Sequence, residues 1–356
     1  MMGEAGIRDC FCQQLSDVKE AISEQGRLRG AMTVFYLLGP FFMLIERSPA
    51  DAWLTLCGLI FLVRCMLKRD WCWTRFFWVR AVLLFWVWCL GSALSSKLPM
   101  YSFGEAAVWI RFPFFAFASA FWLARDPRIL MGMLISMGLG MLIMSGILFA
   151  EFFIVGNEGR RLEWPYGDAT PGNYLAKACL PIFCVLVAIA VSVRERSAGL
   201  AALLSLVTIL ASVLTGERIN LILRVFAGML AGLVCKPIAS RFLLLLGIIA
   251  STFAALLSWR PMIRDRFVSQ FVAELPLNNE SSYWRAWSGA MDAFASSPLK
   301  GIGPDNYRLL CPSISSNNLS ATCFTHPHNY YIQILAETGM IGFILASLMI
   351  ASIIWC

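Results

Sequence analysis

The sequence predicts an all-α polytopic membrane protein, and composition and pattern both indicate it. The chain has 356 residues, of which 59% are hydrophobic, and its mean hydropathy is +0.69. A soluble protein of this length could not bury so much apolar surface. Long uncharged stretches recur at the length that a helix needs to cross a bilayer. They do not alternate polar and apolar residues as the strands of a membrane barrel would.

We expect about ten transmembrane helices. In chain order, their approximate ranges are 30–46, 51–67, 77–95, 103–124, 129–155, 173–193, 198–215, 218–235, 241–258 and 329–355. The first contains Gly39-Pro40, which should kink it. The segment before it is polar and charged, so we expect no cleavable signal peptide.

Basic residues determine the expected orientation. The N-terminal segment and every second short connection are basic; these connections carry Lys68, Arg69, Arg75, Arg125, Arg128, Arg194, Arg196, Lys236 and Arg241. Under the positive-inside rule they are cytoplasmic, and the alternate connections lie outside. The net charge of +7 follows from this rule, so it does not indicate a nucleic-acid partner.

This topology divides the chain into three parts. Residues 1–258 form a transmembrane domain of nine helices with a cytoplasmic N-terminus, and residues 259–328 form a large external loop domain. Residues 329–356 form the last transmembrane helix and end in the cytoplasm.

The loop domain should contain an interfacial helix at about residues 282–296. Trp284, Trp287, Met291 and Phe294 recur at helical spacing and make one apolar face. We expect this face to anchor the helix at the membrane or to dock on the transmembrane domain, with Arg285 on the other side.

Two of the twelve cysteines lie in the long external segment. They are Cys311 and Cys323. If that side is oxidising, the two thiols can form a disulfide just before the histidines. The alternative is two unrelated free thiols.

Several cations contradict the positive-inside rule. Arg161, Arg218 and Arg285 lie on the external side, and Arg111, Lys177 and Arg224 lie in the outer halves of spans. Each could snorkel or pair with an acid such as Glu105, Glu151 or Glu217. As a group on one side, they fit an anionic ligand with a lipid tail. A lipid diphosphate is one such ligand, because the arginine fork matches phosphate oxygens.

The chain has only two histidines, His326 and His328, at the boundary of the last span. Histidine is the side chain whose ordinary pKa lies nearest neutral pH. The acid–base capacity of the chain is therefore concentrated at one point. An isolated histidine here would more simply satisfy a helix end.

His328-Asn329, followed nine residues later by Gly339-Met340-Ile341-Gly342, resembles the signature of O-antigen ligases (WaaL). These ligases belong to the wider O-antigen ligase and polymerase family of membrane glycosyltransferases. Similar segments precede it in the family's order: residues 161–173, the turn 215–218, and residues 283–303. Together they cover roughly residues 156–345.

The resemblance implies a fold like that of the GT-C membrane glycosyltransferases, in a bacterial inner membrane with the active site on the periplasmic side. The donor would be O-antigen polysaccharide on undecaprenyl diphosphate, and the acceptor a sugar hydroxyl of lipid A–core. Membrane lipids would surround the enzyme. The family typically has about twelve spans, whereas we expect about ten here, with one after the histidines. Variation within the family, a span missed in this count and a cut C-terminus all stay open as explanations.

The resemblance also implies roles for single residues. His328 would be the general base of an inverting transfer. Arg218, Arg285 and Arg161 would bind the donor diphosphate, replacing a metal. The supporting or acceptor-side residues would be His326, Asn329, Lys177 and Arg111. No acidic cluster with metal-ligand character is visible, so we expect no metal and no cofactor.

Other functions stay open. An O-antigen polymerase or a protein O-oligosaccharyltransferase would use the same donor with another acceptor. A transporter for anions should show repeat symmetry, and no internal repeat is visible. A lipid-binding scaffold would leave the histidines without a role. We expect a monomer, because no dimer motif such as an isolated Gly-xxx-Gly pair stands out.

Overall fold

The computed structural model is helical throughout the residues that it describes. These are residues 7–156, 162–167, 170–192, 196–234, 238–259, 261–275, 279–316, 318 and 320–356. None of them belongs to a β-strand. The predicted all-α class is confirmed for this part of the chain.

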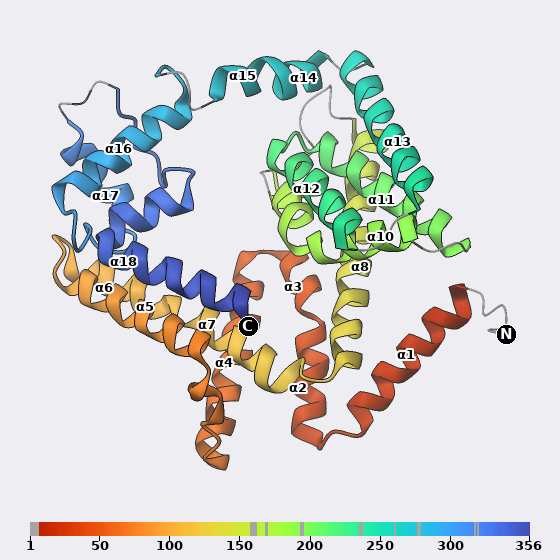
Figure 1. Ribbon diagram of the computed structural model, residues 1–356, viewed down its shortest axis with the longest axis horizontal. Helices are drawn as coiled ribbons and strands as arrows, with labels where there is room; N and C mark the ends of the chain where they lie inside the picture. Colours follow the sequence, from red (N-terminus) through yellow and green to blue (C-terminus); the bar gives the residue numbers. More distant parts are fainter. Residues whose placement is uncertain are drawn as a thin grey trace. The chain divides into compact units, whose positions relative to one another are not determined.

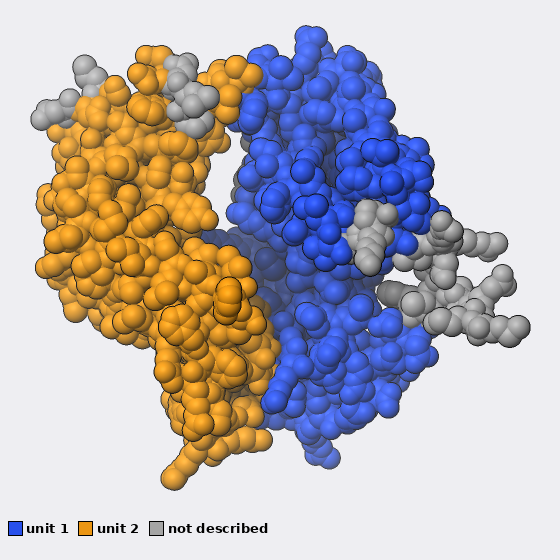
Figure 2. All heavy atoms as spheres, in the orientation of Figure 1, with its two compact units in different colours: residues 1–53, 123–271 blue, residues 54–122, 272–356 orange. Residues whose placement is uncertain are grey.

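The chain folds into two compact units, coloured separately in Figure 2. Unit 1 comprises Met1–Trp53 and Leu123–Phe271, and unit 2 comprises Leu54–Trp122 and Val272–Cys356. Each unit is built from two stretches that are far apart in the sequence. The segment from Val272 to the last helix therefore folds with an early part of the chain.

Unit 1 is a bundle of helices. They are α1 (Ile7–Ser23), α2 (Arg27–Leu37), α3 (Gly39–Ile45), the beginning of α4 (Arg47–Lys68), α8 (Pro127–Ala150), α9 (Thr170–Asn173), α10 (Leu180–Ser192), α11 (Arg196–Leu214), α12 (Arg218–Val234), α13 (Ala239–Trp259), α14 (Pro261–Arg264) and the beginning of α15 (Gln270–Glu274). Three π-helical segments, η3 (Glu151–Val155), η4 (Tyr174–Ala178) and η5 (Asp265–Ser269), continue α8, α9 and α14. α10 packs against α11 and α12.

Arg224 of α12 is buried within unit 1, with 3% of its surface exposed. Its Nε donates to the Ser212 hydroxyl at 2.8 Å and an Nη to the Leu175 carbonyl at 3.1 Å. Its guanidinium lies 4.6 Å from the centre of the Phe183 ring. These partners belong to α11, η4 and α10, so Arg224 ties three elements to α12. Its side chain does not extend to the surface as a snorkelling arginine would. These three partners are a hydroxyl, a carbonyl and an aromatic ring, and none is a carboxylate.

Unit 2 contains the rest of α4 and the last helix of the chain. Its other elements are η1 (Cys72–Arg75), α5 (Phe77–Leu94), α6 (Pro99–Trp109), α7 (Arg111–Ala118), η2 (Ser119–Leu123), α16 (Ser282–Ser296), α17 (Tyr307–Ile314) and α18 (Tyr330–Trp355). α5 contacts both α6 and α18, as Figure 1 shows. α16 packs against α17 and α18.

Six helical runs in the described residues are long and apolar enough to cross a membrane. They are α4, α5, Pro99–Leu123, Pro127–Val155, α13 and α18. Two bent pairs raise the number to eight: α2 with α3, bent by 44°, and Thr170–Ala178 with α10, bent by 56°. The first bend confirms the predicted kink at Gly39-Pro40.

The predicted count of ten also includes α11 and α12. Within α11, Ala198–Leu214 is a shorter apolar helix. α12 has 17 residues and carries Arg218 and Arg224. The chain is thus a multi-pass membrane protein with six to eight candidate spans among its described residues.

α18 is broken at Gly339, where φ is 68° and ψ is −172°. The loop after α16 fills the break with four backbone hydrogen bonds. They run from Met340 N to Pro298 O (2.8 Å), Ile341 N to Leu299 O (3.4 Å), Ile302 N to Ala336 O (3.0 Å) and Gly303 N to Glu337 O (2.9 Å). Two glycine-containing segments distant in the sequence therefore form one backbone junction.

α5 supplies the remaining partners of this junction. The Ser92 hydroxyl donates to the carbonyl of Lys300 at 2.6 Å, and the Trp88 indole donates to the carbonyl of Thr338 at 2.9 Å. A broken helix in a membrane frees backbone groups that water cannot satisfy. The Trp88 indole satisfies one carbonyl freed by the break, and the Ser92 hydroxyl holds the loop that fills it.

Candidate functional site

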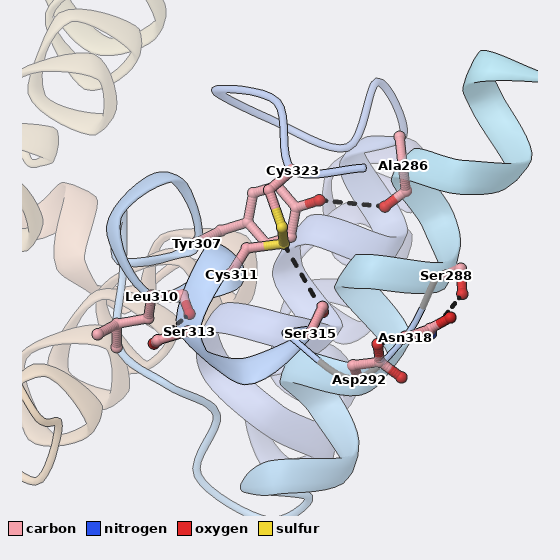
Figure 3. The surroundings of a disulfide bond; sticks show 10 residues. All are labelled: Ala286, Ser288, Asp292, Tyr307, Leu310, Cys311, Ser313, Ser315, Asn318 and Cys323. Carbon is pink, nitrogen blue, oxygen red and sulfur yellow. Dashed lines mark hydrogen bonds between the residues drawn. A yellow bond between two sulfur atoms is a disulfide. The ribbon is translucent and has the colours of Figure 1, made fainter. Parts of the chain in front are cut away.

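The histidines lie in the loop between α17 and α18, which a disulfide fastens at its start. Cys311 of α17 is bonded to Cys323, with the two Cα atoms 5.7 Å apart (Figure 3). This is the pair that the sequence singled out. Cys311 is fully buried, so the loop is attached to the core of the domain just before His326.

Hydrogen bonds to α16 hold the same loop. The backbone N–H of Thr322 donates to the carbonyl of Arg285 at 3.1 Å. Asn318 donates through Nδ2 to the Asp292 carboxylate at 2.8 Å and to the Ser288 hydroxyl at 3.0 Å (Figure 3). The histidine loop and α16 therefore form one connected structure.

α16 packs through its small residues. Ala286, Gly289, Ala290 and Ala293 are its buried positions, while Trp284 and Met291 are 39% and 43% exposed. A Cβ on Gly289 would lie 3.0 Å from the Cys311 sulfur, so the helix approaches α17 closely. Within unit 2, α16 therefore packs through its small residues, because close approach requires small side chains. Anchoring of Trp284 and Met291 at the membrane stays a prediction.

His328 is surrounded by three rings. Its ring centre lies 5.8 Å from that of Tyr283, edge to face, 5.8 Å from that of Phe324, and 4.3 Å from that of His326. Its φ of 54° lies in the left-handed region, which is uncommon outside glycine. Residues held there cost roughly 1–3 kcal/mol and cluster at functional sites.

The environment of His328 favours the neutral imidazole. Its pKa is lowered from the ordinary value of 6.5, first because partial burial disfavours the charged ring and second because His326 adds repulsion. The side chain is nonetheless exposed. An accessible imidazole that stays neutral is suited to accept a proton.

The neighbours of His328 have identifiable structural roles. Asn329 is the N-cap of α18, and its side chain accepts from the N–H groups of Tyr331 (3.1 Å) and Ile332 (3.2 Å). Nδ1 of His326 lies 3.1 Å from the Thr325 hydroxyl. His326 thus contacts both the loop and the ring of His328.

Arg285 lies in the first turn of α16. The helix is capped by Ser281, whose hydroxyl accepts from the Trp284 N–H at 3.1 Å. The Arg285 guanidinium pairs with Glu280 at 2.5 Å and is 41% exposed. Its Nε is buried and makes no hydrogen bond to the described residues. The group is therefore anchored on one side and open on the other.

Arg218 and Lys177 belong to unit 1. Arg218 begins α12 directly after the tight turn at Gly216, where φ is 70°. Nε of Arg266 donates to the Gly216 carbonyl at 2.5 Å, so a second arginine lies at this turn. The sequence places Arg266 among the external arginines without giving it a role in the site. Lys177 is exposed in η4.

The remaining predicted residues lie elsewhere. Arg111 begins α7 in unit 2, with its guanidinium 4.9 Å from the Phe112 ring. Arg161 lies outside the described residues. In the part of the chain that the structure describes, no three His, Cys, Asp or Glu side chains are grouped to hold a metal ion.

The structure thus gathers His326, His328 and Arg285 in unit 2. It adds two rings around His328, those of Tyr283 and Phe324, that the sequence did not assign. The position of Tyr283, two residues before Arg285, was the one sequence feature that could have indicated its ring. The approach of Phe324 depends on how the loop folds.

Residues 200–347 match a family model described as O-antigen ligase. The match runs from α11 to α18 and includes Arg218, Arg285 and His328. No curated protein matches the chain. This stretch is therefore similar to the O-antigen ligase family, and the match covers less than half of the chain.

Proposed function

We propose that this protein transfers O-antigen polysaccharide from undecaprenyl diphosphate to a sugar hydroxyl of lipid A–core. The reaction would take place on the periplasmic face of the bacterial inner membrane. The observation that carries the proposal is the setting of His328. A neutral, accessible imidazole is held in a strained backbone position and is linked through its loop to the helix of Arg285.

The proposed chemistry is a single displacement. His328 takes the proton of the acceptor hydroxyl as the oxygen attacks the anomeric carbon. The bond between that carbon and the diphosphate oxygen breaks, and undecaprenyl diphosphate leaves with the electron pair. One displacement inverts the anomeric centre.

Arginines supply the positive charge in this scheme. Arg285 and Arg218 stabilise the leaving diphosphate, with Arg161 in the same role. Lys177 and Arg111 support the anionic donor, and Asn329 and His326 hold the base in place. Because side chains provide the charge, we propose that no divalent metal is required, and transfer should persist in EDTA.

The test is transfer by purified protein in proteoliposomes, with lipid-linked polysaccharide as donor. A general base contributes about 10²- to 10⁴-fold, so His328→Ala should lose at least about a hundredfold. Ser313→Ala changes an exposed residue of the same domain and should leave the rate unchanged. Wild-type transfer rates by a correctly oxidised His328→Ala protein would refute the base assignment.

The acceptor is tested in the same assay. Lipid A–core, a second lipid-linked glycan and a protein acceptor are supplied in parallel. Transfer to lipid A–core supports a ligase. Transfer only to the glycan or only to the protein would instead indicate a polymerase or an O-oligosaccharyltransferase.

A further inference from the structure

A cavity of about 390 Å³ lies within unit 2, between α5, α6, α18 and the turn before α17. Its polar lining includes Glu105, Trp109, Asp305, Tyr330, Gln333 and Glu337. The lining also includes the apolar residues Phe85, Cys89 and Met349. The cavity therefore combines hydrogen-bonding groups and flat rings with an apolar wall.

The cavity reaches the beginning of α18, close in the sequence to the candidate base. Tyr330 lines it and is the first residue of α18, and His328 stands two residues earlier. Asn329 between them is fixed as the N-cap. A ligand in the polar part of the cavity would therefore lie next to the histidine loop.

The charges of the lining discriminate between ligands. None of the described residues that line the cavity is Lys or Arg, whereas three are Asp or Glu. Asp305 is paired with Arg308 and accepts from the Tyr101 hydroxyl at 2.5 Å. Glu337 is only 8% exposed and accepts from Gln333 at 3.4 Å. The described lining thus offers a diphosphate no cation of its own, and Glu105 would repel it.

A neutral polyol fits this lining better. Hydroxyl groups donate to carboxylates in charge-assisted hydrogen bonds. The rings of Trp109 and Tyr330 offer flat apolar surfaces for the C–H face of a sugar. The amide of Gln333 can both donate and accept.

We propose that this cavity binds the acceptor sugar, with its reactive hydroxyl directed to His328. The proposal rests on the proposed function and adds that different groups bind the two substrates. Carboxylates and rings hold the uncharged acceptor, and arginines hold the anionic donor. The two substrates are thereby sorted by charge.

The kinetic test uses Glu105→Gln and Gln333→Ala in the proteoliposome assay. A lost hydrogen bond to a charged group costs about tenfold or more in affinity. We therefore expect the acceptor KM to rise about tenfold while the donor KM and the pH profile stay unchanged. Asp70→Asn, the same type of charge loss elsewhere in unit 2, is the control. Unchanged acceptor KM in both variants would overturn the proposal, even if transfer itself is normal.

A binding test separates this proposal from the proposed function. Core oligosaccharide released from lipid A is titrated into the detergent-solubilised protein and followed by saturation-transfer NMR. Binding that weakens in Glu105→Gln and persists in His328→Ala supports the cavity, whether or not O-antigen is transferred. The opposite result is also defined. If Glu105→Gln loses co-purified phosphatidylethanolamine but still binds the oligosaccharide, the cavity binds a lipid ammonium group, and the proposal is overturned.

Discussion

Thr322 donates its backbone N–H to the carbonyl oxygen of Arg285 at 3.1 Å. This hydrogen bond joins the loop of the two histidines to the helix of the candidate phosphate-binding arginine. The Cys311–Cys323 disulfide fixes the next residue of the same loop. The candidate base and the arginine are therefore positioned by a common set of constraints.

The first prediction concerns this disulfide. Cys323→Ser should reduce transfer, because the histidine loop loses one of its attachments, and should lower the stability of unit 2 by about 3 kcal/mol. The measurements are transfer rate and thermal unfolding under non-reducing conditions. Dithiothreitol should have the same effect on the wild type.

The control for the disulfide prediction is Cys356→Ser. Cys356 is an exposed free cysteine, so its removal should change neither rate nor unfolding temperature. Full activity of the reduced wild-type protein would show that the loop is positioned without the disulfide.

The second prediction is the pH dependence of transfer. His328 acts as a base only when neutral, and its pKa lies below the ordinary 6.5 because of partial burial and the charge of His326. As pH falls, kcat/KM for the acceptor should hold through pH 6.5 and decline only near the lowered pKa. His326→Ala removes the second cause, so the decline should move to higher pH. A wild-type decline at or above the ordinary value would contradict the assignment.

The third prediction concerns the junction in α18. A Cβ on Gly339 would lie 2.3 Å from the Leu299 carbonyl oxygen, and one on Gly301 would lie 2.3 Å from the Glu337 carbonyl. Both residues also have positive φ, which costs a non-glycine residue about 1–2 kcal/mol before any clash. Gly339→Ala and Gly301→Ala should each lower the unfolding temperature markedly.

Gly91→Ala is the matched control for these glycines. Gly91 lies within α5, and nothing lies within 4 Å of its Cβ position. Alanine favours a helix over glycine by about 1 kcal/mol, so this variant should be as stable as the wild type or more so. Equal stability of Gly339→Ala and Gly91→Ala would mean that the junction does not determine the fold.

The helices could be predicted because transmembrane stretches are marked by length and apolar composition. The bend at Gly39-Pro40 could also be predicted locally, because these residues change the helix backbone at their own positions. The face through which α16 packs could not be predicted this way. Trp284 and Met291 have more apolar surface to bury than Ala290, but close approach to α17 depends on small side-chain size.

The candidate site was accessible to sequence reasoning only in part. His326 and His328 stand out because the chain has no other histidine. The ring of Phe324 against His328, and the junction between Leu299 and Ile341, arise from contacts between separate segments. No local pattern encodes such contacts, so they required the structure.

The last prediction isolates the Arg285 side chain. Its carbonyl holds Thr322, and a substitution leaves that backbone bond in place. Arg285→Lys therefore keeps the loop and the charge but removes the planar fork that matches a diphosphate. We expect transfer to fall by about a hundredfold, the usual effect of removing one preorganised charge-stabilising donor.

The control for Arg285 is Glu280→Gln. Glu280 pairs with the guanidinium at 2.5 Å, but the pair is exposed, and such pairs contribute about 0–1 kcal/mol. This variant retains the fork, so its rate should stay within a few-fold of the wild type. The comparison is made at saturating acceptor with varied lipid-linked donor. If Arg285→Lys matched Glu280→Gln in both rate and donor KM, a fixed point charge would suffice. The role of Arg285 in binding the diphosphate through two parallel hydrogen bonds would then be wrong.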